Sequence, residues 1–420
     1  MNRPNKIYLL AAVFMVVAPM SISGTATEGI KYARLAVTVL MVAAGIFFYK
    51  SPSFGATTRS YVAFIGFFTL ASAWSDDIFW AFFNKGMFLM ATLGGLYMAY
   101  ATKTREELSG GIKLLAVTGT MAGFFLFLLY LMNPEENTSM DRLAVGGMNA
   151  NTIGAAAAPM FILSFFLGLW QTTFKWRLLC FGSSILLAAV ILGSGSRGAA
   201  LMTIVGTLIA TKPFLQKRAA TLILACAIPL GLVQILAITA GIDPISMIPG
   251  LSRITEGGTT ENTRSGMWLY TYRQFEKSPL MGIGWLHFGK GTANCHNAYL
   301  QVLTESGILG AAILLIFLIK LLVRTLEAKR ELQGAPHPEL LALPTGLLAS
   351  IAIHGMVEAS ALLGTTSLPL LLGFSVGLMD RLPDLLHNET QATFTPKPKP
   401  AIPRLDIRSS RRDRPSIIHR

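Results

Sequence analysis

The stretch "YLQVLTESGILGAAILLIFLIKLL", residues 299–322, decides the class of fold. It is mostly apolar, and its length is close to the ~20 residues that an α-helix needs to cross a lipid bilayer. Similar runs recur along the whole chain, in which 52% of the residues are hydrophobic and 14% are charged. A buried helix of a soluble protein explains one such run but not a dozen. The composition therefore predicts an all-α integral membrane protein.

The apolar runs predict about twelve transmembrane helices within one polytopic domain, residues 1–388. The first run resembles a signal peptide, but its apolar core is long enough to remain as a span. Spans 61–74, 198–211 and 367–378 are short, which leaves a tilted, partly re-entrant or extended helix open for them. The predicted spans are residues 7–23, 32–49, 61–74, 79–100, 112–132, 153–170, 176–193, 198–211, 219–240, 299–322, 343–363 and 367–378.

Lysine and arginine in the short loops predict the orientation, because cytoplasmic loops are enriched in them. With a cytoplasmic N-terminus, every even-numbered connection is basic; examples are the loops with Lys50, Lys103, Lys175 and Lys212. The tail 389–420 is basic and rich in proline and serine, so we expect a disordered cytoplasmic segment that contacts anionic lipids. The net charge of +13 is explained by these segments, and nucleic acid is not expected as a partner.

The odd-numbered connections face outward in this topology and carry polar residues of another kind. The longest is a loop of about residues 241–297 between the ninth and tenth spans, enough for a small surface element but not for an independent core. Four polar groups gather on this side: Arg142 with Asn149 and Asn151, Arg197 in "GSGSR", Arg264 with Trp268 and Arg273, and His296 with Asn297. They predict a functional site on the outward face.

Arg197 is the most informative of these arginines, because it lies in a very short turn between two apolar spans. A charged residue at that depth normally has a partner or a role. Its planar guanidinium matches phosphate oxygens bidentately, and Gly193, Gly195 and Gly198 let a bulky group approach the backbone. Several outward arginines therefore fit a pyrophosphate on a lipid carrier, with surface salt bridges as the alternative for each of them.

His296 follows Cys295 and allows three chemical interpretations. A Cys–His catalytic pair is disfavoured, because adjacent side chains point in different directions. A metal site is disfavoured because the chain has no cysteine–histidine ligand spacing, and we expect neither a metal nor a cofactor. A general base needs only a reachable hydroxyl and a side chain that titrates near neutral pH. His296 is thus a candidate base or a structural cap, and Asn297 either orients the imidazole or caps the following helix.

Three further polar residues are weaker candidates. His354 and Glu358 are spaced i, i+4 in the eleventh span and so share a helix face, which favours a structural hydrogen-bonded pair over membership of the site. Lys85 lies about two turns inside the fourth span, where it either reaches a carrier phosphate or snorkels outward.

Three motifs resemble the O-antigen ligase family, whose superfamily also holds O-antigen polymerases and O-linking oligosaccharyltransferases. They are "DRLAVGGMNANTIG", "GSGSRGAAL" and the run from "TRSGMWLYTYRQFEKSPLMGIGWLHFG" to "CHNAYLQVLTESGILG". The third is the most specific, with arginine and tryptophan, then Pro-Leu-x-Gly-x-Gly, His-Asn-x-Tyr-Leu and Glu-x-Gly-x-x-Gly. The motifs span about residues 142–310, and the layout of spans extends the resemblance over most of the chain.

The resemblance implies an enzyme of the bacterial inner membrane, with both termini in the cytoplasm and its site facing the periplasm. Such an enzyme transfers O-antigen from undecaprenyl pyrophosphate to a sugar hydroxyl of lipid A-core, with inversion and without a divalent metal. By motif position, His296 would activate the acceptor, and Arg197 and Arg264 would hold the pyrophosphate. Arg142 would join them through a looser motif.

Other functions remain open at this point. O-antigen polymerases have two substantial outward loops, whereas only one loop is long here, which favours a ligase. A protein O-oligosaccharyltransferase is less favoured, because the chain shows no added C-terminal domain of the kind that some of them have. A transporter would place ionisable residues deep within several spans and show a pseudo-repeat, whereas the polar residues here gather in the outward loops.

Overall fold

The computed structural model describes residues 6–20, 28–49, 53–132, 142–145, 148–214, 263–285, 287–288, 291–292, 295–332, 337, 339–359 and 366–394. The described chain is helical apart from turns and one short antiparallel hairpin. The predicted ninth span and residues 395–420 of the tail lie outside the described residues, as do residues 241–262 of the predicted outward loop. The elements are α1 (Lys6–Met20), α2 (Glu28–Tyr49), α3 (Ala56–Leu70), η1 (Ala71–Trp74), α4 (Ile78–Ala101), α5 (Arg105–Met132), α6 (Ala150–Trp170), α7 (Phe174–Ser194), a helix over residues 197–214, α10 (Thr263–Lys277), β1 (His287–Phe288), β2 (Gly291–Thr292), α11 (Ala298–Glu331), α12 (Glu339–Gly355) and α13 (Leu368–Phe394).

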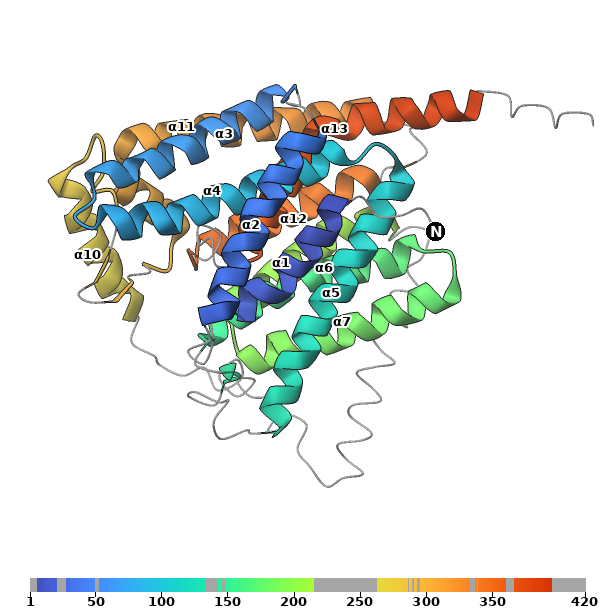
Figure 1. Ribbon diagram of the computed structural model, residues 1–420, viewed down its shortest axis with the longest axis horizontal. Coiled ribbons are helices and arrows are strands. Elements are labelled where there is room, and N and C mark those ends of the chain that lie inside the picture. The colour runs from blue at the N-terminus through green and yellow to red at the C-terminus, as the bar shows by residue number, and fades with distance from the viewer. Residues whose placement is uncertain are drawn as a thin grey trace, which may run out of the picture.

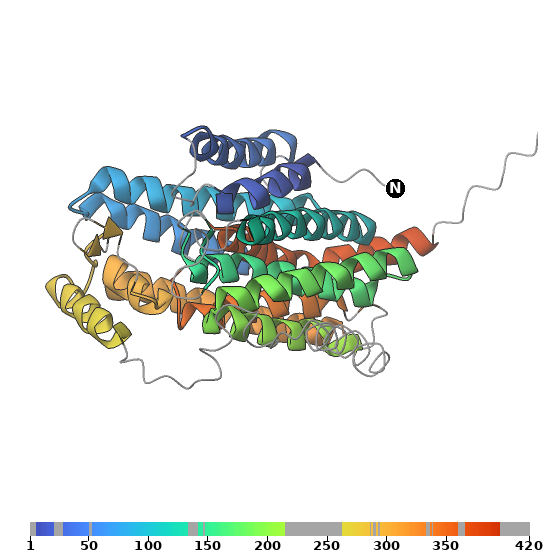
Figure 2. The ribbon, with the colours of Figure 1, turned by 90° about the horizontal axis from the view of Figure 1, so that it is seen from below.

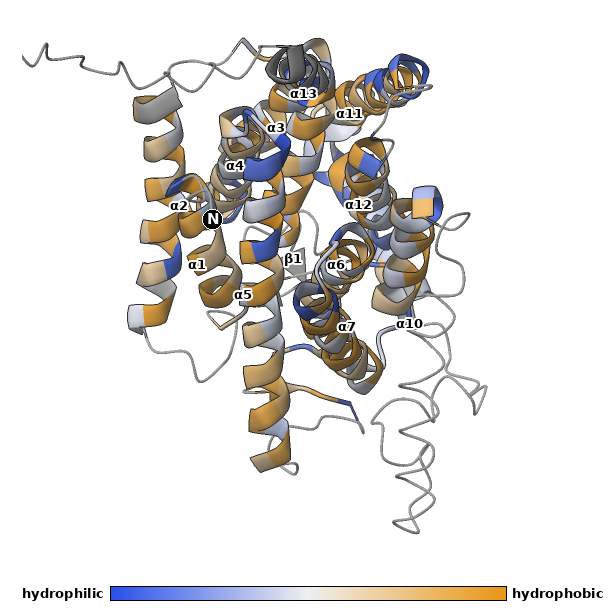
Figure 3. Ribbon diagram, turned by 90° about the vertical axis from the view of Figure 1, so that its right-hand side faces the viewer, coloured by the Kyte–Doolittle hydropathy of each residue, from blue (hydrophilic) through white to orange (hydrophobic). Residues whose placement is uncertain are grey.

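The helices are apolar on surfaces that face away from the bundle. Among the described residues, α5, α6, α7 and α11 are long and apolar enough to cross a membrane, and three shorter apolar helices accompany them. Phe47 is 81% exposed on α2 and Phe124 is 54% exposed on α5. Figure 3 shows the apolar colouring over the outer faces of α2, α5 and α7. Exposed apolar surface on this scale suits a lipid environment, so the helical membrane class is supported, whereas the prediction of twelve spans is not confirmed.

The bundle is held together by close helix packing. A Cβ atom on Gly95 of α4 would lie 1.9 Å from the carbonyl oxygen of Leu370, and one on Gly373 of α13 would lie 2.1 Å from that of Thr92. The backbones of α4 and α13 can approach this closely only because both positions are glycine. Small residues at helix interfaces are typical of membrane bundles, where dispersion forces rather than water exclusion drive helix association.

α10 covers one end of this bundle. Figures 1 and 2 show it lying across the ends of α3, α4 and α11, far from the end where α13 leaves the bundle. We call the end covered by α10 the α10 end. His296 lies two residues before the start of α11 at this end, so the candidate base and α10, a part of the longest predicted outward loop, lie at the same end of the molecule.

α11 is broken at Gly307, although the sequence predicted one continuous span. Gly307 has φ of 66° and ψ of −170°, a conformation outside the helical range. The N–H groups of Ile308 and Leu309 donate to the carbonyl oxygens of Pro279 and Leu280, at 2.9 and 3.2 Å. Residues 278–285, which we call the docking segment, thus supply partners that the helix itself lacks at the break.

The docking segment also satisfies the other side of the break. The N–H groups of Ile283 and Gly284 donate to the carbonyl oxygens of Thr304 and Glu305, at 3.0 and 2.9 Å. Non-helical backbone at membrane depth is stable only where such groups are paired within the protein. The Pro-Leu-x-Gly-x-Gly and Glu-x-Gly-x-x-Gly motifs are therefore the two halves of one interlocked structure.

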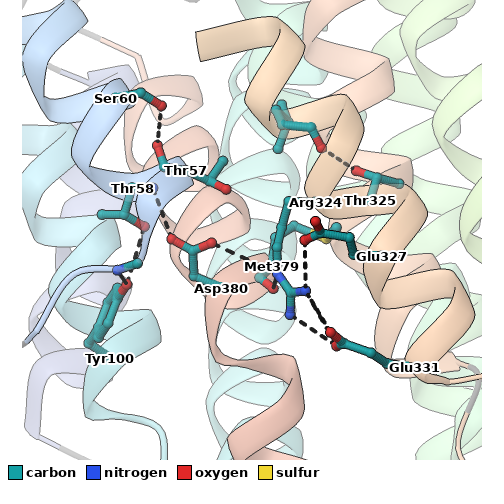
Figure 4. Close-up of polar contacts among 12 residues, drawn as sticks. Thr57, Thr58, Ser60, Tyr100, Arg324, Thr325, Glu327, Glu331, Met379 and Asp380 are labelled. Atoms are coloured by element: carbon teal, nitrogen blue, oxygen red, sulfur yellow. Dashed lines mark hydrogen bonds and ion pairs between the residues drawn. The ribbon is translucent and has the colours of Figure 1, made fainter. Parts of the chain in front are cut away.

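The opposite end of the bundle has its own polar clamp, shown in Figure 4. Asp380 of α13 accepts a hydrogen bond from the backbone N–H of Thr58 in the first turn of α3, at 2.9 Å. Arg324 of α11 lies 4.0 Å from the Asp380 carboxylate and 3.2 Å from Glu331. These contacts tie α3, α11 and α13 together. α13 continues to Phe394, past residue 388 where the sequence analysis placed the start of the disordered tail.

Candidate active site

His296 lies in a strained turn at the start of α11. Its φ of 53° makes it the one non-glycine residue with positive φ in the part of the chain that the structure describes. A left-handed conformation costs such a residue about 1–3 kcal/mol, and the surrounding contacts must offset it. The indole Nε1 of Trp268 donates to the carbonyl oxygen of Cys295 at 2.8 Å. We call Cys295, His296 and Asn297 together the His296 turn.

Asn297 holds the other side of the His296 turn. Its Oδ1 atom accepts from the backbone N–H groups of Tyr299 and Leu300, both at 3.0 Å, and caps α11. Its Nδ2 atom donates to the carbonyl oxygen of Met356 at 3.2 Å. The capping alternative for Asn297 is thereby confirmed, and the same side chain ties the turn to the segment after α12.

The carboxylate of Glu358 is the partner of His296. The Nδ1 atom of His296 lies 2.8 Å from Oε1 of Glu358, and the two side chains are 20% and 4% exposed. An ionised carboxylate only accepts hydrogen bonds, so it fixes the imidazole proton on Nδ1 and leaves Nε2 as the acceptor. α12 ends at Gly355, so Glu358 lies in the turn beyond the helix rather than on a shared helix face with His354.

Glu358 is in turn held by a chain of polar contacts from α6 and α7. Asn151 donates to Oε1 of Glu358 through Nδ2 at 2.6 Å. Arg142 donates to Oδ1 of Asn151, and its Nε atom donates to the carbonyl oxygen of Ser194 at 2.7 Å. The predicted polar groups of Arg142 and His296 therefore meet through Glu358, and Trp268, from the predicted group of Arg264, contacts the His296 turn. Arg142 contacts Asn151 and the end of α7 in this assembly, and its role as a phosphate ligand stays a prediction.

Arg197 begins the helix over residues 197–214 directly after a tight turn. Gly195 ends α7 in the left-handed conformation, and Ser196 accepts from the N–H of Ala199 at 3.3 Å as an N-cap. A Cβ atom on Gly198 would lie 2.8 Å from Val357, the residue before Glu358. The turn therefore packs against the loop that carries Glu358, and the side chain of Arg197 is exposed beside it.

Arg264 lies in the first turn of α10, four residues before Trp268. Residues spaced i, i+4 lie on one side of a helix, and Trp268 reaches the His296 turn from α10. The backbone of Arg264 therefore lies one helical turn from the residue that anchors α10 to Cys295.

Lys85 occupies a different environment from either of the two that the sequence suggested. Its side chain is 1% exposed and its Nζ atom lies 3.0 Å from Oε2 of Glu305, which is fully buried. Nζ also donates to the carbonyl oxygen of Gly284 and lies 4.0 Å from the ring centroid of Phe68. An ammonium so enclosed neither snorkels nor faces a bound phosphate. It joins α4 to the broken helix and to the docking segment.

His354 and Cys295 are structural neighbours of the site. His354 is fully buried, and Gly198 packs against its ring. Burial raises the pKa of the Cys295 thiol to about 11, and the thiol donates to the carbonyl oxygen of Asn297. A thiol in this state is a poor nucleophile. No group of three or more histidine, cysteine, aspartate or glutamate side chains in the described residues is arranged to hold a metal ion.

A comparison with protein-family models matches the segment that carries the turn of Arg197, α10, the docking segment and the His296 turn. Residues 182–315 match the model of the O-antigen ligase family. The match supports the family to which the motifs pointed, and with it a glycan-transferring enzyme of the O-antigen ligase superfamily. No curated protein matches the chain.

The segment matched by the family model holds only part of the assembled site. Arg197, Arg264 and His296 lie within the matched residues, whereas Arg142, Asn151 and Glu358 lie outside them. The i, i+4 spacing of His354 and Glu358 predicted that these two residues form a pair, and the pairing of Glu358 with His296 was not predicted from the sequence. The spacing signal pointed to a helix that ends before Glu358, and only the fold brings these two segments together.

Proposed function

We propose that this protein is an O-antigen ligase. It transfers O-antigen from undecaprenyl pyrophosphate to a sugar hydroxyl of lipid A-core, at the periplasmic face of the bacterial inner membrane. The family match supports glycan transfer, and the pair formed by His296 and Glu358, 2.8 Å apart, is the observation that carries the mechanism. A partly exposed imidazole held through Nδ1 by a buried carboxylate is an arrangement suited to a general base.

The proposed step moves one proton and exchanges one bond. Nε2 of His296 takes the proton of the acceptor hydroxyl while the hydroxyl oxygen attacks the anomeric carbon from the face opposite the leaving group. The bond from that carbon to the pyrophosphate oxygen breaks, and the pyrophosphate departs with the electron pair, so the configuration inverts. Glu358 stabilises the imidazolium that forms and keeps the ring in position. This step needs no metal and no cofactor.

Arg197 and Arg264 are the proposed pyrophosphate ligands. Arg197 is exposed at the N-terminus of a helix, where backbone N–H groups and the helix dipole also favour an anion. Its turn packs beside the loop of Glu358, which supports a position for its positive charge close to the base. Arginine matches two phosphate oxygens at once and neutralises the charge that develops on the leaving group. Arg142 supports the base by holding Asn151.

An O-antigen polymerase is the second candidate, because the family match covers the superfamily to which polymerases also belong. It would extend the glycan on the lipid carrier with the same base and the same leaving group. A protein O-oligosaccharyltransferase and a transporter rank below it. The paired His296 and Glu358 favour catalysis of transfer over transport.

A gene deletion distinguishes a ligase from a polymerase in the native host. Loss of a ligase leaves long glycan chains on the lipid carrier and none on lipid A-core. Loss of a polymerase leaves single repeats attached to the core. Electrophoresis of the lipopolysaccharide and analysis of the carrier-linked pool read out both. We expect long carrier-linked chains, with normal lipopolysaccharide restored by the wild-type gene; single repeats on the core would contradict the ligase assignment.

A further inference from the structure

A cavity of about 670 Å³ lies at the α10 end, outside the pair of His296 and Glu358. Its walls come from the turn between η1 and α4, from α10 and from the docking segment. Trp74, Tyr270 and Trp285 provide aromatic surface in this lining. The volume is within the usual range of small-molecule sites, which is about 300–1,000 Å³.

The polar part of the lining carries both charges. Asp76 is exposed on one side, and Gln274, Lys277 and Ser278 lie on the other. Lys277 donates to Oε1 of Gln274 at 2.8 Å, and the carboxylate of Asp76 in the same lining offsets the charge of this lysine. A phosphate or another anion is not favoured by such a lining. The lining instead offers both hydrogen-bond donors and hydrogen-bond acceptors, which suits a ligand rich in hydroxyl groups.

Aromatic rings beside hydroxyl-binding groups match the chemistry of carbohydrates. A pyranose ring has an apolar face of C–H bonds, which packs on an aromatic ring, and a rim of hydroxyl groups, which need hydrogen bonds. Trp74 already donates its indole N–H to the carbonyl oxygen of Met281 at 3.0 Å, which fixes the ring at the edge of the cavity. Trp285 is only 7% exposed and closes the inner wall. Rigid rings of this kind bind at a low cost in side-chain entropy.

The cavity shares a wall with the His296 turn. Tyr270 and Ile283 line the cavity, and both also pack against Cys295, the residue before His296. Trp268, two residues before Tyr270 on α10, donates to the Cys295 carbonyl oxygen. A sugar in the cavity is therefore separated from the base by the layer of side chains around Cys295.

We infer that this cavity is a carbohydrate-binding subsite that holds a sugar of a glycan substrate beyond the residue that reacts at His296. The inference rests on the proposed function in one respect, because the sugar belongs either to the O-antigen donor or to the lipid A-core acceptor. The two sources share the same chemistry, and the binding experiment separates them.

The experiment uses the full chain purified in lipid nanodiscs and two free oligosaccharides as probes. One is O-antigen oligosaccharide released from its carrier, and the other is core oligosaccharide released from lipid A. Tryptophan fluorescence and calorimetry measure binding. We expect saturable binding of one of the two, which identifies the source. Binding is expected to weaken at least about tenfold, or ~1.4 kcal/mol, in Trp74→Ala and Gln274→Ala.

Matched variants keep the result interpretable. Trp80→Ala removes another exposed tryptophan of the same end that lies outside the cavity lining, and it should bind as the wild type does. Trp74→Phe keeps a ring, so it should bind more tightly than Trp74→Ala. Gln274→Ala leaves the bond from Trp74 to Met281 in place and so guards against misfolding as the cause. The inference is overturned if neither oligosaccharide binds the wild-type protein. It is also overturned if Trp74→Ala, Gln274→Ala and Trp80→Ala all bind the oligosaccharide as tightly as the wild type does.

The His296→Ala variant separates this inference from the proposed function. It should bind the oligosaccharide like the wild type while transfer is lost. If the wild-type protein binds the oligosaccharide through Trp74 and Gln274 but shows no transfer, the ligase proposal is refuted and the subsite is supported. Transfer that depends on His296, together with oligosaccharide binding that ignores the cavity variants, would support the ligase and refute the subsite.

Discussion

His296 and Glu358 are 62 residues apart in the sequence, yet Nδ1 of the imidazole lies 2.8 Å from Oε1 of the carboxylate. Glu358 is 4% exposed, and its Oε1 atom also accepts from Asn151. The carboxylate is therefore fixed before a substrate arrives. It orients a base that stands at the edge of the bundle.

Glu358→Gln tests whether this carboxylate supports the base. An amide keeps the size of the side chain but cannot stabilise a positive imidazolium, so kcat for transfer should fall at least about tenfold, or ~1.4 kcal/mol, with KM little changed. Glu339→Gln is the matched control, because Glu339 pairs with His337 at 3.0 Å. That pair lies at the other end of α12, about 25 Å away by the rise of a 17-residue helix. Equal activity of the two variants would contradict the role of Glu358.

Arg197→Lys tests the proposed binding of pyrophosphate. Lysine keeps the positive charge but lacks the planar fork, so one charge-assisted hydrogen bond is lost. Such a bond contributes about 1.5–3 kcal/mol, so kcat/KM for the lipid-linked donor should fall about ten- to a hundredfold. Arg177→Lys, at the start of α7 and far from the turn of Arg197, serves as the control. Unchanged donor kinetics in Arg197→Lys would remove this arginine from the site.

The sequence was sufficient for the class of fold and for the position of His296, because both depend on local patterns. Apolar runs predicted most of the helices, and the residues around Asn297 predicted the start of α11. The break at Gly307 could not be predicted, since its stability depends on hydrogen bonds from Pro279 and Leu280. The spacing of His354 and Glu358 was misleading for a related reason: α12 ends at Gly355, and tertiary contacts then set the partner of Glu358.

Gly307→Ala tests the interlock between α11 and the docking segment. A Cβ atom there would lie 2.2 Å from the carbonyl oxygen of Leu280, and the positive φ alone costs an alanine about 1–3 kcal/mol. We expect a lower thermal unfolding midpoint and faster proteolysis between α10 and α11. Gly266→Ala is the control, because a Cβ atom on Gly266 would meet nothing within 4 Å. A Gly307→Ala protein as stable as Gly266→Ala would show that the break tolerates a side chain.

The buried pair of Lys85 and Glu305 gives a further prediction on stability. Lys85→Met leaves the Glu305 carboxylate buried without its ammonium partner, which should cost about 3–5 kcal/mol of unfolding free energy. The double variant Lys85→Met/Glu305→Gln removes both charges and should recover much of that loss. Chemical unfolding of the protein in detergent, followed by tryptophan fluorescence, measures all of them. Lys320→Met, an exposed lysine of α11, should unfold like the wild type. A double variant no more stable than Lys85→Met would argue against this pairing.

Transfer by His296→Ala tests the central claim most directly. The purified protein would be given lipid-linked O-antigen and lipid A-core, and product formation would be followed by electrophoresis. His296→Asn provides a second variant that tolerates the left-handed conformation of the turn, so loss of folding and loss of the base can be told apart. We expect both variants to remain folded and their rates of transfer to fall about 10²–10⁴-fold. Transfer by folded His296→Ala at nearly the wild-type rate would contradict the central claim.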